Sequence, residues 1–174
     1  PNPGFYAALK KFGVKWRRTD IPVIIHLIAE APETIARMIG KLEEEGSVAG
    51  VELGFRHDHE LDEIVEMVEA ANGELPIITR IPDALLKEAV EEIPKAGAFA
   101  ISLAPPRGMI NHNSSLISGR LHGPGLLPQT QMSMDSIASA NANIIPAGWF
   151  DSLDNAQPLL DAGAMAVQLE GFHF

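Results

Sequence analysis

The chain has 174 residues, enough for one domain with a substantial core, and its 46% apolar and 21% charged residues are typical of a soluble globular protein. Thirteen basic against 23 acidic residues give a net charge of −10, which argues against a nucleic-acid partner because polyanion binding needs a concentrated positive face. The absence of cysteine excludes disulfides, thiolate metal sites and a cysteine base. No apolar run reaches the length of a membrane span and no signal peptide is visible, so we expect a cytoplasmic protein without a membrane partner.

One pattern occurs three times along the chain: an apolar strand, an amphipathic helix, a glycine and a second strand. The copies are PVIIHL, PETIARMIGKLEEE, Gly46 and AGVEL over 22–53; PIITRI, DALLKEAVEEIPKA, Gly97 and AFAISLA over 76–104; and NIIPA, DSLDNAQPLLDA, Gly163 and AMAVQL over 143–169. Apolar residues at helical spacing predict the helices, and each glycine supplies the left-handed residue that ends a helix. The near-continuous apolar runs predict strands that are covered on both faces.

Alternating strands and helices predict a parallel α/β sheet with right-handed crossovers. Six strands are expected, near residues 22, 49, 76, 98, 143 and 164. This count fits strands 3–8 of a (β/α)8 TIM barrel whose first two strands lie upstream of Pro1. An open doubly wound sheet is the alternative, but the GxGxxG fingerprint of nucleotide binding follows none of the strands.

The whole chain, 1–174, is predicted to be a single domain that makes up the C-terminal three-quarters of a barrel. Residues 105–125 are rich in Gly, Pro, Asn and Ser, which favours an irregular, lid-like loop over the barrel mouth. The next segment, PQTQMSMDSIASAN at 128–141, is predicted to be a helix.

A polar cluster follows the second expected strand and contains Arg56, His57, Asp58, His59 and Glu60. His57 is a candidate general base, because an unperturbed imidazole titrates near neutrality. The pair His57 and His59 also allows a metal site, but such sites need three or four convergent ligands, and the strands offer only His26, Glu52 and Glu170 as partners. The third interpretation is a charged loop that leads into the next helix.

Two polar residues lie within otherwise apolar strands. For His26 we expect a hydrogen-bonded histidine within the barrel mouth. Arg80 needs an anionic or polar partner, because burying a lone charge is costly. That partner is either a ligand or a strand-end acid such as Glu52.

The order and spacing of these segments resemble the FMN-dependent dihydroorotate dehydrogenases over nearly the whole chain. The resemblance rests on PNPGFYAAL at 1–9, GSVAGVELGF at 46–55, PIITRIPDAL at 76–85, ISGRLHGPGLLP at 117–128 and IIPAGWFDSLDNAQPLLDAGAMAVQLEG at 144–171. The last two segments are the most specific, since a barrel alone requires neither. The resemblance implies FMN at the C-terminal mouth of the barrel, held by a lysine, asparagines and glycine amides, and a Cys or Ser base that takes a proton from dihydroorotate.

The resemblance also implies which residues of this chain face the cofactor. These residues are Arg80, Gly119, Gly148 and Gly171. Arg80 falls on the flavin-facing lysine and keeps its charge with a wider, planar head. The glycines would offer backbone contacts. Trp149 and Glu170 replace the neighbours of two of these glycines, and a glutamate beside a phosphate is repulsive.

For substrate and catalysis, the resemblance implies Gly54 and His122 as substrate-facing positions and His57 as the catalytic base. Gly54 falls on an asparagine of the family and His122 on a serine. The departures from the family pattern concentrate at ligand-facing positions while the helices and glycine turns remain. The chain thus resembles a divergent member whose ligand chemistry has changed or been lost.

We therefore expect an enzyme: an FMN-linked oxidoreductase that converts dihydroorotate to orotate in pyrimidine biosynthesis, or that acts on a similar small ring acid. One alternative is a degenerate barrel without flavin that serves as a binding or structural subunit. The other is a metal-dependent hydrolase that uses His57 and His59; the leading interpretation involves no metal. The exposed sheet edges of a barrel lacking two strands predict a homo-oligomer or part of a larger assembly.

Overall fold

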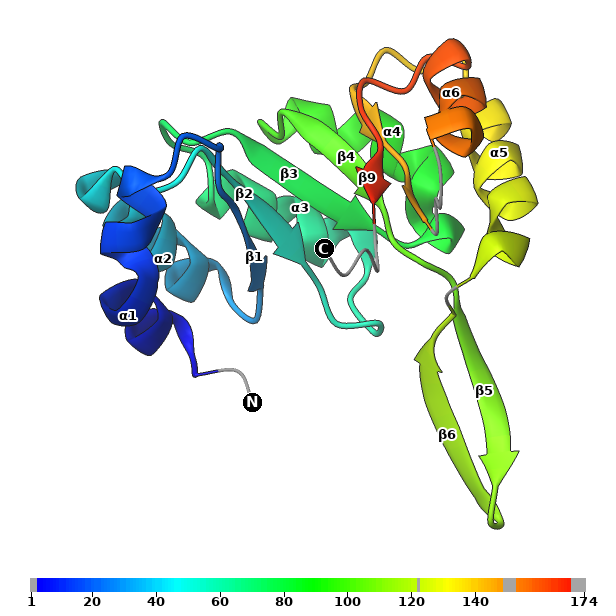
Figure 1. Cartoon of the computed structure of the whole chain (residues 1–174), viewed down its shortest axis with the longest axis horizontal. Coiled ribbons are helices and arrows are strands. Elements are labelled where there is room, and N and C mark those ends of the chain that lie inside the picture. Colours follow the sequence, from blue (N-terminus) through cyan, green and yellow to red (C-terminus); the bar gives the residue numbers. More distant parts are fainter. Residues whose placement is uncertain (1–2, 122, 149–152, 170–174) are drawn as a thin grey trace. The chain divides into compact units, whose positions relative to one another are not determined.

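The computed structural model describes residues 3–121, 123–148 and 153–169 (Figure 1). These residues form two compact units. The first comprises Pro1–Thr79 and Glu92–Phe99, and the second Arg80–Glu91 and Ala100–Phe174. Strand β3 (Ile77–Ile81) runs from the first unit into the second, and helix α4 (Leu86–Lys95) returns to the first.

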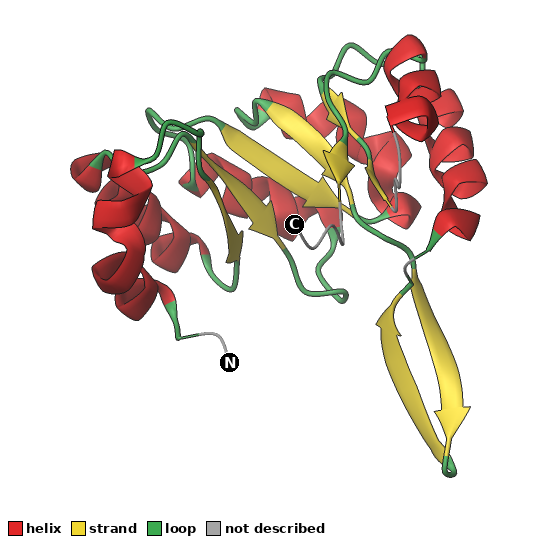
Figure 2. Cartoon of the chain, in the orientation of Figure 1, coloured by secondary structure: helices red, strands yellow, loops and turns green. Residues whose placement is uncertain are grey.

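The first unit is built on the parallel strands β1 (Ile24–Ile28), β2 (Gly50–Gly54) and the beginning of β3, in the order β1-β2-β3. Helix α1 (Phe5–Arg18) precedes β1, α2 (Pro32–Glu45) connects β1 to β2, and α3 (Leu61–Ala70) connects β2 to β3. Helices α2 and α3 lie side by side on one face of the strands (Figure 2). The predicted alternation of parallel strands and helices is confirmed here.

The local signals of α2 act as the sequence predicts. Pro32 lies in the first turn, where its missing N–H costs no hydrogen bond. Gly46 ends the helix with φ 55°, and its N–H donates to the carbonyls of Leu42 and Glu43. A left-handed backbone conformation at this point favours glycine, which has no Cβ to clash with the following carbonyl.

Side chains alternate between the two faces of each strand of the first unit. One face is apolar and buried, with Leu27, Val51 and Leu53 as central residues. The helices contribute Ile35, Ile39, Leu42, Ile64, Met67 and Val68 to this core. The opposite face carries the polar residues His26 and Glu52, so the strand alternation separates the apolar packing face from a polar face.

The second unit contains the end of β3, β4 (Ala100–Leu103) and β7 (Ile144–Ile145), in the order β3-β4-β7. The strands are followed by the short helix η1 (Asp83–Leu85) with α4, by η2 (Pro124–Leu126) with α5 (Leu127–Ser136), and by α6 (Leu153–Asp161). A second short parallel pair joins β8 (Ala147–Gly148) to β9 (Gln168–Leu169). Five of the large buried residues of this unit are Ile81, Leu86, Ile101, Met134 and Leu159.

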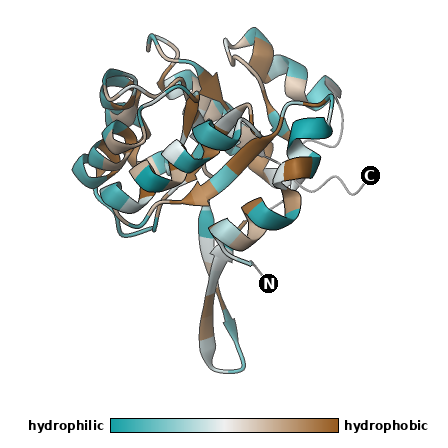
Figure 3. Cartoon of the chain, turned by 90° about the vertical axis from the view of Figure 1, so that its left-hand side faces the viewer, coloured by the Kyte–Doolittle hydropathy of each residue, from teal (hydrophilic) through white to brown (hydrophobic). Residues whose placement is uncertain are grey.

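A β-hairpin extends from the second unit, away from β4 and α5 (Figure 1). Its strands β5 (Arg107–His112) and β6 (Ser115–Arg120) pair antiparallel in full register. The irregular structure expected for 105–125 is therefore wrong. Asn113 and Ser114 connect the strands with φ 50° and 62°, the left-handed pair that matches the twist of a two-residue hairpin. Figure 3 shows hydrophobic residues along the hairpin.

Other element boundaries differ from the expected ones in detail. The helix expected at 83–96 begins with a 3-10 turn, and α4 proper starts at Leu86. The helix expected at 128–141 ends at Ser136. In the part of the chain that the structure describes, none of the helices is both long and apolar enough to cross a membrane.

Candidate functional site

His26 and Glu52 face each other across β1 and β2. They are register partners in the parallel pair, and Nδ1 of His26 lies 2.6 Å from Oε2 of Glu52. The Glu52 side chain is 7% exposed and the His26 side chain 33% exposed. A carboxylate buried in a strand is costly without hydrogen-bond donors, so the contact stabilises Glu52 there. It also fixes the orientation of the imidazole.

The contact favours one tautomer of the neutral imidazole. One ring nitrogen then carries the proton and the other accepts hydrogen bonds. With Nδ1–H donated to Glu52, the lone pair lies on Nε2. A carboxylate that holds an imidazole in this way is the general arrangement that prepares a histidine to accept a proton.

Gly54 at the end of β2 makes room for this ring. A Cβ at position 54 would lie 2.6 Å from both Cε1 and Nε2 of His26, closer than side chains pack. It would also lie 3.3 Å from Cδ1 of Ile28. The imidazole thus lies against the backbone of Gly54, in the space that a side chain at this position would need.

A cavity of about 350 Å³ adjoins the histidine within the first unit. Its lining comes from α1, β1, the loop after β1 and the first half of α2, and includes Phe5, Trp16, His26, Glu30 and Met38. Most of these side chains are apolar, and His26 and Glu30 supply ionisable groups. This volume lies within the range of small-molecule sites, which combine apolar walls with a few polar groups.

The polar cluster after β2 forms local contacts with a structural role. The guanidinium of Arg56 donates from Nε and Nη2 to the two carboxylate oxygens of Asp58, at 3.0 and 2.7 Å. Both side chains are exposed. The hydrogen bonds from Arg56 lower the pKa of Asp58 from 3.8 to about 2, and the same pairing raises the pKa of Arg56.

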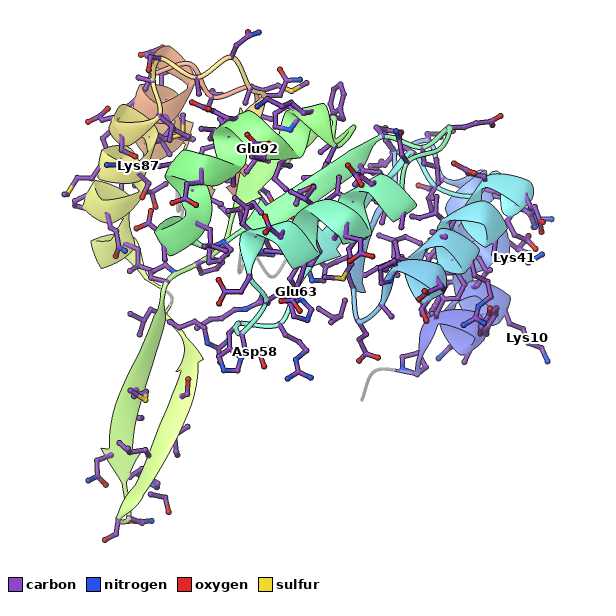
Figure 4. The ribbon with its side chains drawn as sticks, turned by 180° about the vertical axis from the view of Figure 1, so that it is seen from behind. Lys10, Lys41, Asp58, Glu63, Lys87 and Glu92 are labelled. Carbon is purple, nitrogen blue, oxygen red and sulfur yellow. The ribbon has the colours of Figure 1, made fainter. Side chains whose placement is uncertain are left out.

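The rest of the cluster begins helix α3. Glu60 is the N-cap, and its backbone N–H donates to the carboxylate of Glu63 at 2.8 Å in a capping box. Asp58 lies in the loop just before α3, and Glu63 lies in its first turn (Figure 4). The rings of Phe55 and His59 are tilted against each other with centroids 6.4 Å apart, and His57 is exposed in the turn. The interpretation as a charged loop leading into a helix therefore describes most of this segment.

The metal alternative gains no support from the described residues. Within 3–121, 123–148 and 153–169, no group of three or more His, Cys, Asp or Glu side chains is arranged to hold a metal ion. His57 and His59 lie in this region, and His59 packs against Phe55.

The structure places the other predicted site residues of the described chain as follows. Gly54 and His57 belong to the first unit, and Gly54 lies against His26. Arg80 belongs to the second unit and is 7% exposed in β3. Gly119 lies in β6 opposite Gly108, with open space where a Cβ would stand, and Gly148 pairs with Leu169 in the β8–β9 pair. His122, Trp149, Glu170 and Gly171 lie outside the described residues.

Sequence reasoning considered His26 and Glu52 separately and did not pair them. The missing information was the register of β1 and β2, which are separated by a whole helix. The expected strands, 22–27 and 49–53, place His26 fifth of six residues and Glu52 fourth of five, whereas in the structure each is the third residue of a five-residue strand. Parallel strands of equal length that start in register place such residues opposite each other.

Comparison with known proteins gives a distant relationship. No protein-family model matches the chain. The catalytic subunit of dihydroorotate dehydrogenase B (NAD(+)) from Pyrococcus furiosus is 25% identical, over 97% of this chain and 62% of the relative. The chain therefore spans less than two thirds of that relative's length.

Solved structures with a similar fold include two of the tryptophan synthase alpha-subunit from Pyrococcus furiosus. A mutant of that subunit has a TM-score of 0.65 with 14% identity, over 95% of this chain and 62% of the subunit. A second structure has a TM-score of 0.61 at the same identity, over 95% and 60%. The predicted (β/α)8 barrel-like architecture is thus confirmed as a partial barrel. At this identity the likeness concerns the fold alone.

Proposed function

We propose that the chain is the barrel of an FMN-linked oxidoreductase that acts on dihydroorotate or a similar small ring acid. The observation that carries this proposal is the similarity to a dihydroorotate dehydrogenase catalytic subunit over 97% of the chain, on a barrel-like fold. Barrel enzymes place their chemistry at the C-terminal ends of the strands. In the first unit, the face of β1 and β2 that carries His26 and Glu52 supports a reactive centre of this kind.

The residues that the resemblance assigns to FMN binding suit this cofactor in part. Arg80 is a buried cation on β3, suited to an anionic or electron-rich ring. The open space at Gly119 leaves its backbone accessible. Gly54 departs from the family pattern, because His26 lies where an asparagine side chain would stand. When bound, FMN would supply the hydride acceptor, and the protein would bind and orient the substrate and manage its protons.

The test is a titration of the purified chain with FMN, followed by visible absorption and then by addition of dihydroorotate. The proposal expects saturable binding of the flavin and bleaching of its visible band by dihydroorotate. Arg80→Gln should weaken FMN binding by about tenfold, the loss of one charged contact of about 1.4 kcal/mol. Arg37→Gln, a change of an exposed arginine on α2, is the matched control and should leave binding unchanged. Absence of FMN binding by the wild-type chain would contradict the proposal.

The alternative of a barrel without flavin is favoured by one observation. The substrate-facing position Gly54 has no side chain, and its space is filled by His26. In that case the cavity of the first unit would bind a ligand without redox chemistry. A protein that stays colourless after FMN addition, and that still binds a small ring acid in calorimetry, would support this second function.

Assembly is a further part of the proposal. We expect a homo-oligomer or a component of a larger assembly, and the exposed apolar residues of the hairpin, such as Met109 and Leu116, support this expectation. Sedimentation velocity of the purified chain tests it. A monomer at all concentrations would contradict the homo-oligomer.

A further inference from the structure

We propose that His26 is the residue that removes a proton from the substrate and that Glu52 is its positioning residue. The proposal rests on the function proposed above, because it takes a small ring acid as the substrate class. It differs from the resemblance, which assigns the base to His57. Three observations within the first unit carry it: the imidazole–carboxylate contact, the packing against Gly54 and the adjoining cavity.

The imidazole–carboxylate contact prepares Nε2 to act as a base. Glu52 accepts Nδ1–H at 2.6 Å and is itself almost fully buried on the central strand of the unit. The carboxylate therefore has few alternative positions, and it stabilises the positive charge that develops when Nε2 takes up a proton. His26 is one third exposed, so a ligand can reach the ring.

The packing against Gly54 shows that the position of the ring depends on a glycine at this point. Any side chain at position 54 would overlap the Cε1–Nε2 edge of His26. The resemblance places a ligand-contacting asparagine at this position. A glycine here gives up that amide contact and makes room for an imidazole from the neighbouring strand. Glycine in place of asparagine at position 54 thus removes a side chain that binds substrate and makes room for an imidazole that can accept a proton.

The cavity supplies the space for a substrate of the proposed class. It measures about 350 Å³, and His26 is one of its lining residues, together with apolar residues of α1 and α2. In such surroundings a ring acid can expose a C–H bond next to a carbonyl. That bond breaks, its proton goes to Nε2 of His26, and its electron pair stays on the substrate as an enolate conjugated with the carbonyl. The step needs no oxidant, so it can be observed apart from flavin chemistry.

His57 is a weaker candidate on the same criteria. It lies exposed in the turn between β2 and α3. Its neighbour Asp58 is engaged by Arg56 in a bidentate contact. A base must be held in one orientation to transfer protons efficiently. In the first unit, the contact with Glu52 holds the ring of His26 in such an orientation.

The experiment follows the exchange of substrate protons with solvent. The full chain is incubated with dihydroorotate in D2O, and proton NMR follows the loss of the signal at the carbon next to the ring carbonyl. Wild-type protein should catalyse the exchange. His26→Ala should slow it by at least about 100-fold, the usual contribution of a general base. Added imidazole should restore part of the rate in this variant. His112→Asn, a change of an exposed hairpin histidine, should keep the wild-type rate.

Glu52→Gln tests the positioning role. The glutamine keeps a hydrogen-bond acceptor but removes the negative charge, so the exchange rate should fall by about tenfold and its pH profile should shift. Glu52 on β2 contacts the imidazole and Glu30 after β1 lines the same cavity as His26, so Glu30→Gln serves to separate the effects of the two carboxylates on the profile. A residue with a structural role alone would change the melting temperature and leave the pH profile in place.

The outcomes separate this inference from the proposed function. Exchange that survives in His26→Ala and is lost in His57→Asn would overturn the inference in favour of the turn histidine. Absence of exchange with wild-type protein would overturn it as well. Exchange that depends on His26, in a protein that does not bind FMN, would contradict the oxidoreductase and leave the base assignment standing. If His26→Ala does not fold, as judged by circular dichroism, Gly54→Ala supplies the second variant, because it displaces the ring without removing it.

Discussion

The imidazole of His26 lies against the backbone of Gly54, so that even a single methyl group on residue 54 would stand 2.6 Å from two of its ring atoms. This relationship joins two neighbouring strands, and it explains why a glycine ends β2 although its backbone is extended. The two residues are separated by α2 in sequence. Their proximity is a product of the parallel register.

Gly54→Ala should therefore move the ring of His26 and leave the fold intact. The ring is the far end of a side chain that is one third exposed, so it can rotate, at a cost of about 0.5–1.5 kcal/mol for an unfavourable rotamer. The side-chain resonances of His26 should shift strongly in NMR spectra while the melting temperature falls by only a few degrees. Unchanged His26 resonances would show that the ring does not occupy this position.

Much of the fold could be predicted from the sequence because its signals are local. Apolar runs, helical periodicity and a glycine after each of the three repeated helices indicated the strands and helices, and Gly46, Gly97 and Gly163 all have positive φ. The hairpin at 107–120 was missed because its composition is that of a loop. Its strands depend on pairing between residues such as Ile110 and Ile117, and pairing is not visible in a single segment.

The site was harder to predict than the fold. The polar cluster at 56–60 is conspicuous because its residues are adjacent in sequence, yet its members mostly contact one another and cap α3. The contact between His26 and Glu52, by comparison, joins residues that a helix separates. Adjacent polar residues are conspicuous in a sequence, whereas register partners emerge only once the strands are aligned.

Two glycines of the first unit should respond in opposite directions to alanine. Gly97 has φ 103°, and a Cβ there would lie 2.7 Å from Nδ2 of Asn72, so Gly97→Ala should destabilise the protein by about 1–3 kcal/mol. Gly40 lies within α2 with open space at its Cβ, so Gly40→Ala should stabilise it by about 0.5–1 kcal/mol. Urea unfolding measures both changes, and a shift of the same sign in the two variants would contradict the packing described.

The Arg56–Asp58 contact predicts that Asp58 stays ionised at a lower pH than an ordinary aspartate. Asp58 has a folded pKa of about 2 because Arg56 donates hydrogen bonds to it, against 3.8 for the ordinary side chain. The folded pKa is the lower one, so the stability that the contact contributes is fully present above pH 3.8 and is lost as the pH falls through about 2. Carbon-detected NMR of the Asp58 carboxyl measures the titration. Arg56→Gln should return the pKa towards its ordinary value, and equal titrations in the two proteins would disprove the contact.

The turn of the hairpin predicts a stabilising substitution. Ser114 has φ 62°, a conformation that costs an ordinary residue roughly 1 kcal/mol and that glycine adopts freely. Ser114→Gly should therefore slow hydrogen exchange of the amides in β5 and β6 by a few fold. The matched change Ser118→Gly lies within β6 and should accelerate that exchange, because glycine weakens a strand. Faster exchange in Ser114→Gly would argue against this turn.

The arrangement of His26 and Glu52 is tested most directly by long-range nitrogen–proton NMR of the histidine side chains in the wild-type protein and in Glu52→Gln. Under conditions where the imidazole is neutral, we expect Nδ1 of His26 to carry the proton and Nε2 to show the shift of an unprotonated nitrogen. This preference should weaken in Glu52→Gln. A His26 ring protonated at Nε2, or one with the tautomer mixture of a free histidine in both proteins, would contradict a carboxylate-held base on β1.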